Sequence, residues 1–152
     1  MKIELIEQTF DDYTGYKYKP FKWCCENLEK NEMINLVNEY DQNDYDSDEF
    51  PMMAIRHTER FYDWGDEYEQ DYYYRITHCP FCGEPIKIFI VGQENVSEVY
   101  KNLKEERDKI WKKYCRTDSK KKEAELRNIV RELDDKVNYF FNLTEYKKLE
   151  EI

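Results

Sequence analysis

The chain has 152 residues, of which 38% are charged, and its net charge at pH 7 is −10. Its mean hydropathy is −1.03, and no apolar run approaches the roughly 18 residues that a membrane-spanning helix needs. The sequence therefore excludes helical membrane proteins, and we expect no membrane partner. Aromatic residues form 16% of the chain and must supply much of its core.

The negative charge is concentrated in one half of the chain. Residues 1–75 carry 19 acidic and 8 basic side chains, whereas residues 76–152 carry 15 acidic and 16 basic ones. The acidic residues are densest from 39 to 75, where 12 of them accompany three arginines. Such a surface repels nucleic acid and attracts basic partners.

The first fifty residues alternate between short apolar patterns and polar segments. Residues 2–7 predict a strand, and residues 10–20 predict a polar, turn-rich segment. A helix is expected over 26–40, because apolar residues fall at near-helical spacing, followed by an acidic loop at 41–50. The residues of that helical pattern are Leu28, Met33, Leu36, Val37 and Tyr40.

Three strands are expected next, at 52–57, 72–77 and 86–91. The second and third of these segments are rich in β-branched and aromatic residues, and the first contains Ile55. A turn is expected at 63–66, which contains Asp63-Trp64-Gly65-Asp66. The second and third strands are joined through a Cys-x-x-Cys turn, an arrangement typical of a zinc ribbon.

The pattern becomes helical from residue 95, where Asn95 and Glu98 have the spacing of a capping box. Two apolar stripes follow, separated by a short basic linker at 117–122, and they predict an antiparallel helical hairpin. We therefore expect an α+β fold with an acidic domain at 1–93 and a helical hairpin at 94–152. The first domain would hold one helix and a small antiparallel zinc-ribbon-like sheet, and the hairpin offers a face for a homodimer.

Four cysteines form the strongest motif in the chain. Cys79 and Cys82 lie in Cys-Pro-Phe-Cys-Gly, a turn on which both thiolates can reach one tetrahedral Zn²⁺. Cys24 and Cys25 are adjacent, and together with the first pair they would complete a structural zinc site.

An alternative ligand set stays open from the sequence. Only one of the adjacent cysteines would then bind, with His57 or His78 as the fourth ligand. Neither His-Glu-x-x-His nor any other catalytic zinc motif is present in the sequence, so the metal is expected to be structural. The odd number of cysteines, five, argues against a secreted disulfide framework and for the cytoplasm.

Two segments around the cysteines resemble a known family: Lys22-Trp23-Cys24-Cys25-Glu26 and Cys79-Pro80-Phe81-Cys82-Gly83-Glu84-Pro85-Ile86. They resemble the small zinc-ribbon proteins of phages and prophages in low-GC bacteria, which have a Cys-Cys-Glu segment and a later Cys-Pro-x-Cys-Gly turn. The resemblance implies zinc bound by these four cysteines, a mobile-element origin and a bacterial host. It implies no activity.

The acidic segment suggests a binding function. Its carboxylates alternate with aromatic residues, so a rigid arrangement of them could imitate the phosphates of a duplex and occupy the nucleic-acid channel of a host enzyme. The alternative is an ordinary solvated surface. The candidate partner-binding residues are Asp41, Asp44, Asp46, Asp48, Glu49, Asp63, Asp66, Glu67, Glu69 and Asp71.

The preferred hypothesis is a non-enzymatic inhibitor of a bacterial nucleic-acid-handling complex, of the anti-CRISPR or anti-restriction type, with no direct contact to nucleic acid. The second hypothesis is a nucleic-acid-binding zinc-ribbon regulator. An enzyme is disfavoured because no phosphate-binding glycine loop is present among the chain's four glycines. The regulator hypothesis rests on basic residues of the helical hairpin: Lys101, Lys104, Lys112, Lys113, Arg116, Lys120, Lys121 and Lys122.

Overall fold

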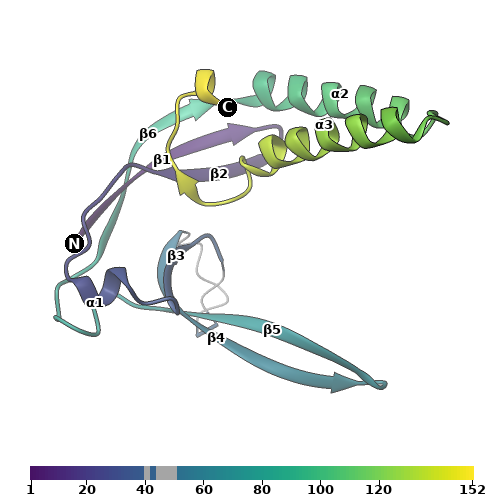
Figure 1. Ribbon diagram of the computed structural model, residues 1–152. Coiled ribbons are helices and arrows are strands. Elements are labelled where there is room, and N and C mark those ends of the chain that lie inside the picture. The colour runs from purple at the N-terminus through teal and green to yellow at the C-terminus, as the bar shows by residue number, and fades with distance from the viewer. Residues whose placement is uncertain (40–41, 44–50) are drawn as a thin grey trace. The chain divides into compact units, whose positions relative to one another are not determined.

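A computed structural model describes residues 1–39, 42–43 and 51–152 (Figure 1). It confirms a mixed α+β protein, with two β-sheets and three α-helices among these residues. No helix in the described part of the chain combines the length and apolarity needed to cross a bilayer. Five predicted partner-binding residues lie outside the described residues: Asp41, Asp44, Asp46, Asp48 and Glu49.

One sheet has four strands in the order β6-β1-β2-β7. They are β1 Lys2–Phe10, β2 Tyr13–Tyr18, β6 Lys87–Asn95 and β7 Thr144–Glu145. β1 and β2 form an antiparallel hairpin, whereas the short β7 joins the edge of β2 in parallel. The sheet is therefore mixed and larger than the small antiparallel sheet predicted from the sequence.

The second sheet is antiparallel, with the order β3-β4-β5. It consists of β3 Ile34–Val37, β4 Met52–Asp63 and β5 Asp66–Arg75. β5 pairs with β4 from Ala54 opposite Arg75 as far as Asp63 opposite Asp66, so the predicted turn at 63–66 is confirmed. Both strands are longer than predicted, since their pairing continues past the buried segment into residues exposed on both faces.

The helix expected over 26–40 is wrong. Its first turn is α1, Glu26–Glu29, but the chain then turns and forms β3. The Asn31 side chain accepts a hydrogen bond from the Met33 N–H at 3.0 Å, which stabilises this turn. The segment after the turn pairs with β4 from Ile34 opposite Ile55 to Val37 opposite Met52, and this tertiary pairing overrides the helical spacing.

The prediction of a turn-rich segment at 10–20 is also wrong, because most of it is strand β2. Lys17 is fully buried in this strand. Its Nζ donates to the Asn142 carbonyl oxygen at 2.9 Å and lies 3.6 Å from the centre of the Tyr139 ring. Burial lowers the pKa of Lys17 to about 8. Lysine is usually exposed, so its presence here made the segment look like a polar loop in the sequence.

The helices α2, Ser97–Tyr114, and α3, Lys120–Asn138, pack against each other (Figure 1). The N-cap of α2 is Val96, so the predicted cap at Asn95 is wrong by one residue. Asn95 ends β6, and its side-chain oxygen accepts a hydrogen bond from the Ser97 N–H at 3.0 Å. A 3₁₀ turn at Leu149–Glu151 follows β7.

The described residues divide into two compact units. The first contains Met1–Glu4 and Lys19–Phe89, and the second contains Leu5–Tyr18 and Ile90–Ile152. The core of the second unit joins strand residues to both long helices. Its buried residues are Phe10, Val96, Tyr100, Val137 and Phe140.

Gly15 sets how closely β2 approaches the end of α3. A Cβ at this position would lie 2.4 Å from the Phe140 carbonyl oxygen and 3.2 Å from Phe10 Cε1. We expect Gly15→Ala to lower the free energy of unfolding by about 1–3 kcal/mol, because backbone atoms must move to admit the methyl group. Thermal melting followed by circular dichroism measures this effect.

Gly92→Ala is the matched control in the same sheet. Its Cβ would meet Ile6 Cδ1 at 2.9 Å, and this atom is the flexible end of a side chain. The control should lose less stability than Gly15→Ala, and equal losses would contradict the close-approach argument.

Candidate metal centre and acidic hairpin

Two short segments of the first unit present the four predicted cysteines. Cys24 and Cys25 lie on the bend before α1, where the extended backbone of Cys25 (φ −158°) separates the two side chains. Cys79 and Cys82 lie in the turn between β5 and β6, which the Gly83 N–H closes by donating to the Cys79 carbonyl oxygen at 2.9 Å. Gly83 has φ 76°, a value that favours glycine.

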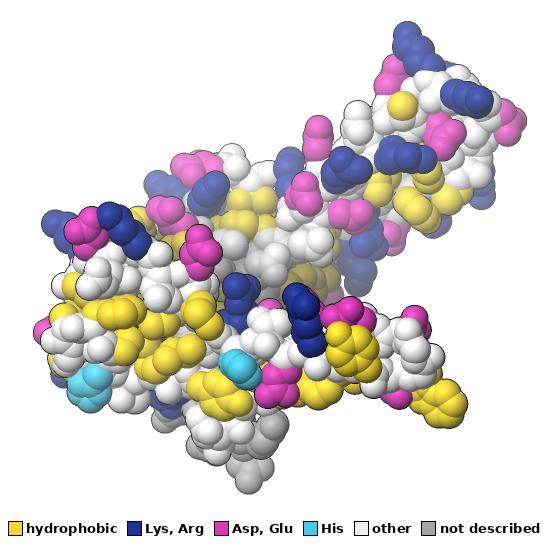
Figure 2. Space-filling model, turned by 60° about the horizontal axis from the view of Figure 1, so that its bottom comes forward, with side chains coloured by type: hydrophobic (Ala, Val, Ile, Leu, Met, Phe, Trp, Pro, Cys, Tyr) yellow, Lys and Arg dark blue, Asp and Glu magenta, His cyan; other side chains and the backbone are white. Residues whose placement is uncertain are grey.

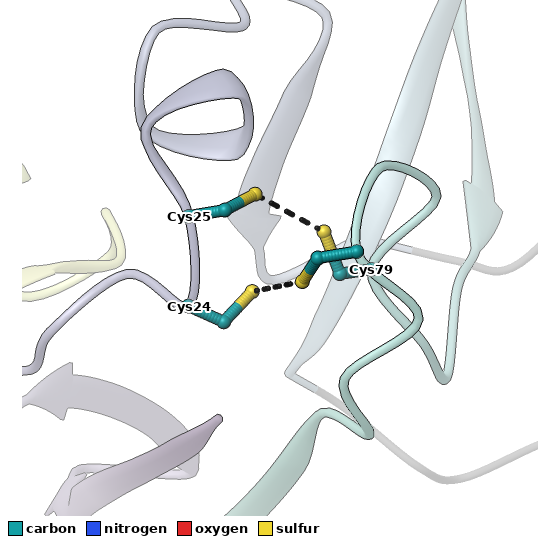
Figure 3. A group of neighbouring side chains, drawn as sticks. Cys24, Cys25 and Cys79 are labelled. Atoms are coloured by element: carbon teal, nitrogen blue, oxygen red, sulfur yellow. Dashed lines mark hydrogen bonds between the residues drawn. The ribbon is translucent and has the colours of Figure 1, made fainter.

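The four sulfur atoms converge (Figure 3). Cys25 Sγ lies 3.6 Å from Cys79 Sγ, and Cys24 Sγ lies 3.6 Å from Cys82 Sγ. All four lie within 4.8 Å of one another. A tetrahedral ion with metal–sulfur bonds of about 2.3 Å would hold its sulfurs about 3.8 Å apart. The four cysteines thus lie close enough to hold a metal ion.

The histidines that the sequence left as alternative ligands have other neighbours. His57 Nε2 lies 3.3 Å from Glu59 Oε1, and the side chain is 54% exposed. His78 Nδ1 lies 3.0 Å from Thr77 Oγ1. The cluster of possible ligands comprises the two cysteine pairs without either histidine.

The metal-free thiols do not ionise together, because each thiolate would repel the others. Burial raises the pKa of Cys24 to about 12, with further contributions from Cys82 and Cys79. The pKa of Cys25 is also raised: a backbone hydrogen bond at Leu28 opposes this, but burial and the neighbouring thiols outweigh it. Burial likewise opposes ionisation of Cys79, yet backbone N–H groups of Cys82 and Phe81 lower its pKa to about 7. A bound cation would remove the repulsion.

Sequence reasoning missed a backbone contact that holds the turn with Cys79 and Cys82 in place. The Lys87 N–H donates to the Met1 carbonyl oxygen at 2.9 Å, which ties the start of β6 to β1. Within the turn, the Cys79 N–H donates to the Glu84 carbonyl oxygen, also at 2.9 Å. Hydrogen bonds between backbone groups do not depend on residue type, so the sequence could not predict them.

The remaining predicted partner-binding residues lie on the hairpin of β4 and β5, with exposed side chains. Two of them are paired with one arginine: Arg60 lies 3.8 Å from Glu67 and 2.8 Å from Glu69. Asp71 accepts a hydrogen bond from Thr58 Oγ1 at 2.5 Å.

Asp63 and Asp66 flank the turn of this hairpin. Among the residues that the structure describes, no cationic group lies within 4.0 Å of either carboxylate. The tip of the hairpin therefore carries two carboxylates without a cationic partner.

Trp64 occupies the tip itself and is 98% exposed. Its φ is 51° and that of Gly65 is 92°. Positive φ at both central residues defines a type I′ turn, where asparagine is preferred to a bulky residue at the first position. Figure 2 shows hydrophobic side chains, in yellow, at the end of this arm at lower right.

No family model, curated protein or solved structure matches this chain.

The cysteine cluster predicts that metal binding needs all four thiols. We expect Cys82→Ser to abolish stoichiometric binding of Co²⁺, used as a spectroscopic substitute, and to remove its thiolate charge-transfer absorption. Cys115→Ser is the matched control, because Cys115 is a free, exposed cysteine outside the cluster. Unchanged absorption in Cys82→Ser, or its loss in Cys115→Ser, would contradict the proposed ligand set.

The pKa values predict how metal affinity depends on pH. Above pH 7 Cys79 is largely ionised in the metal-free protein, whereas Cys24 and Cys25 hold their protons. Binding must displace at least these two protons, so affinity should rise by about 100-fold or more per pH unit between pH 7 and 8. Competition with a chelator of known affinity, buffered at several pH values, measures the slope. A slope near zero would be inconsistent with protonated ligands.

Proposed function

We propose that the bound ion is structural Zn²⁺ and that the turn with Cys79 and Cys82 is of the zinc-ribbon type. Four sulfur ligands around one position favour Zn²⁺ in a closed, non-catalytic site. The earlier resemblance to phage and prophage zinc-ribbon proteins supports the same ligand set. In this proposal, Zn²⁺ stabilises a zinc-ribbon-like β-structure, and a helical hairpin follows it in the chain.

We propose further that the protein is a non-enzymatic binding module, and that the β4–β5 hairpin is its contact surface. The observation that supports this best is Trp64. A large non-glycine residue at positive φ raises the conformational free energy of the folded chain by about 1 kcal/mol or more. The Trp64 ring is almost fully exposed, so packing in the free protein does not offset this cost. Tryptophan is the residue most enriched among binding hot spots.

The charge around Trp64 indicates the chemistry of the partner. Uncompensated carboxylates at Asp63 and Asp66 beside an aromatic anchor fit a basic protein surface. Proteins that handle nucleic acid offer such surfaces, and an acidic arm could compete there with phosphates. We therefore propose an inhibitor of a bacterial nucleic-acid-handling complex, of the anti-CRISPR or anti-restriction type, acting in the cytoplasm of the host.

The substitution Trp64→Asn separates binding from folding. Asn-Gly is a preferred pair in type I′ turns, so the variant should keep its melting temperature or raise it. Removal of an anchor residue should weaken partner binding about tenfold or more. The measurement is affinity capture from nuclease-treated bacterial lysate, with captured proteins quantified by mass spectrometry.

Trp111→Gln removes another exposed ring, from α2, and is the matched control. The proposal expects one nucleic-acid-handling protein to be captured by the native chain and by the control, lost with Trp64→Asn, and displaced by added DNA or RNA. Capture that survives Trp64→Asn, or that nucleic acid cannot displace, would refute the role of the hairpin.

A further inference from the structure

A groove of about 730 Å³ lies between the end of α2 and the start of α3. It lies within the second unit and shares no residue with the cysteine cluster or the β4–β5 hairpin. Leu126 and Ile129 give it an apolar side, with Ile129 40% exposed. The other lining residues are Lys109, Lys112, Lys113, Arg116, Thr117, Lys122 and Glu125.

The groove has an excess of positive charge within an acidic protein. Five of its lining residues are cationic and one is anionic. Lys109 lies 3.9 Å from Glu105. The other four cations have no carboxylate within 4.0 Å in the described part of the chain. Figure 2 shows Lys and Arg side chains, in dark blue, beside exposed hydrophobic ones on the helical region at upper right.

The spacing of these cations suits a nucleic-acid strand. The four that α2 and its end supply, from Lys109 to Arg116, follow the i, i+3, i+4, i+7 pattern of one helix face. They span about 10 Å at 1.5 Å per residue. A stacked strand offers one phosphate per 3.4 Å, or about three over this length. Carboxylates on one face of an extended peptide recur only every 6.6 Å or so, a poorer match.

The apolar side of the groove distinguishes a single strand from a duplex. Leu126 and Ile129 can contact the face of an unpaired base while the cations contact the phosphates. A duplex stacks its bases inside the helix and would leave these two side chains unused. We propose that this groove binds single-stranded nucleic acid through its backbone, without sequence preference.

This inference goes beyond the proposed function, which rests on the hairpin of the other unit. It also differs from the expectation of no direct contact with nucleic acid, which rested on the dense acidic segment at 39–75. Exposed charges farther apart than about 8 Å are largely screened at physiological salt. The local excess of cations can therefore act despite the net charge of −10.

The test uses the zinc-loaded full chain and a fluorescent twelve-nucleotide oligo-dT, with binding followed by anisotropy. Neutralising three to four phosphates predicts a slope of log affinity against log salt of about −2 to −3. A slope near zero would overturn the proposal. So would tighter binding of a duplex of the same length, or equal competition by polyglutamate of the same charge.

Two double variants locate the site. Lys112→Gln/Arg116→Gln removes two groove cations and should weaken binding at least tenfold. Lys101→Gln/Lys104→Gln removes the same charge from exposed positions of α2 outside the groove, and should change affinity less than twofold. Circular dichroism checks that α2 persists in both. Equal losses in the two variants would mean diffuse attraction and would overturn the assigned site. Trp64→Asn should leave this binding unchanged, so each proposal can fail independently.

Discussion

The convergence of four cysteine sulfurs is the constraint on which the first unit depends. It joins the bend before α1 to the turn after β5, segments 54 residues apart in the chain. Few large apolar residues are buried in this part, with Leu28 and Met52 among them. Structural zinc contributes about 10–16 kcal/mol in small zinc-finger peptides. A metal centre can therefore stabilise a unit whose apolar core is small, and leave much of its aromatic content at the surface.

The β4–β5 hairpin belongs to this unit and buries little of its own surface. Its base is anchored by buried Met52, Met53 and Ala54, but its outer half is exposed on both faces and has no core of its own. Cross-strand pairs hold it instead, including the stacked Phe61 and Tyr68 rings, whose centres are 5.4 Å apart. A two-stranded arm of this kind is marginal in isolation. Its order therefore depends on the buried residues at its base.

The sequence predicted those features that local chemistry determines. The Cys-x-x-Cys turn with Gly83, the turn at 63–66 and the two long helices each follow from spacing and residue type within a few residues. Prediction from the sequence failed where contacts with residues distant in the chain determine the secondary structure. The segment after α1 has helical spacing but pairs with β4, and β2 contains Lys17, whose burial depends on Asn142 and Tyr139. The sequence shows that Cys24 and Cys25 are adjacent. Only the fold shows that Cys25 lies nearest Cys79 and that Cys24 lies beside Cys82.

Net charge is a poor guide to what this protein can bind, because the two units differ. Uncompensated carboxylates gather at Asp63 and Asp66, and uncompensated cations gather around Arg116. At physiological salt each cluster acts only on ligands within about a Debye length, so the two proposed surfaces do not cancel each other.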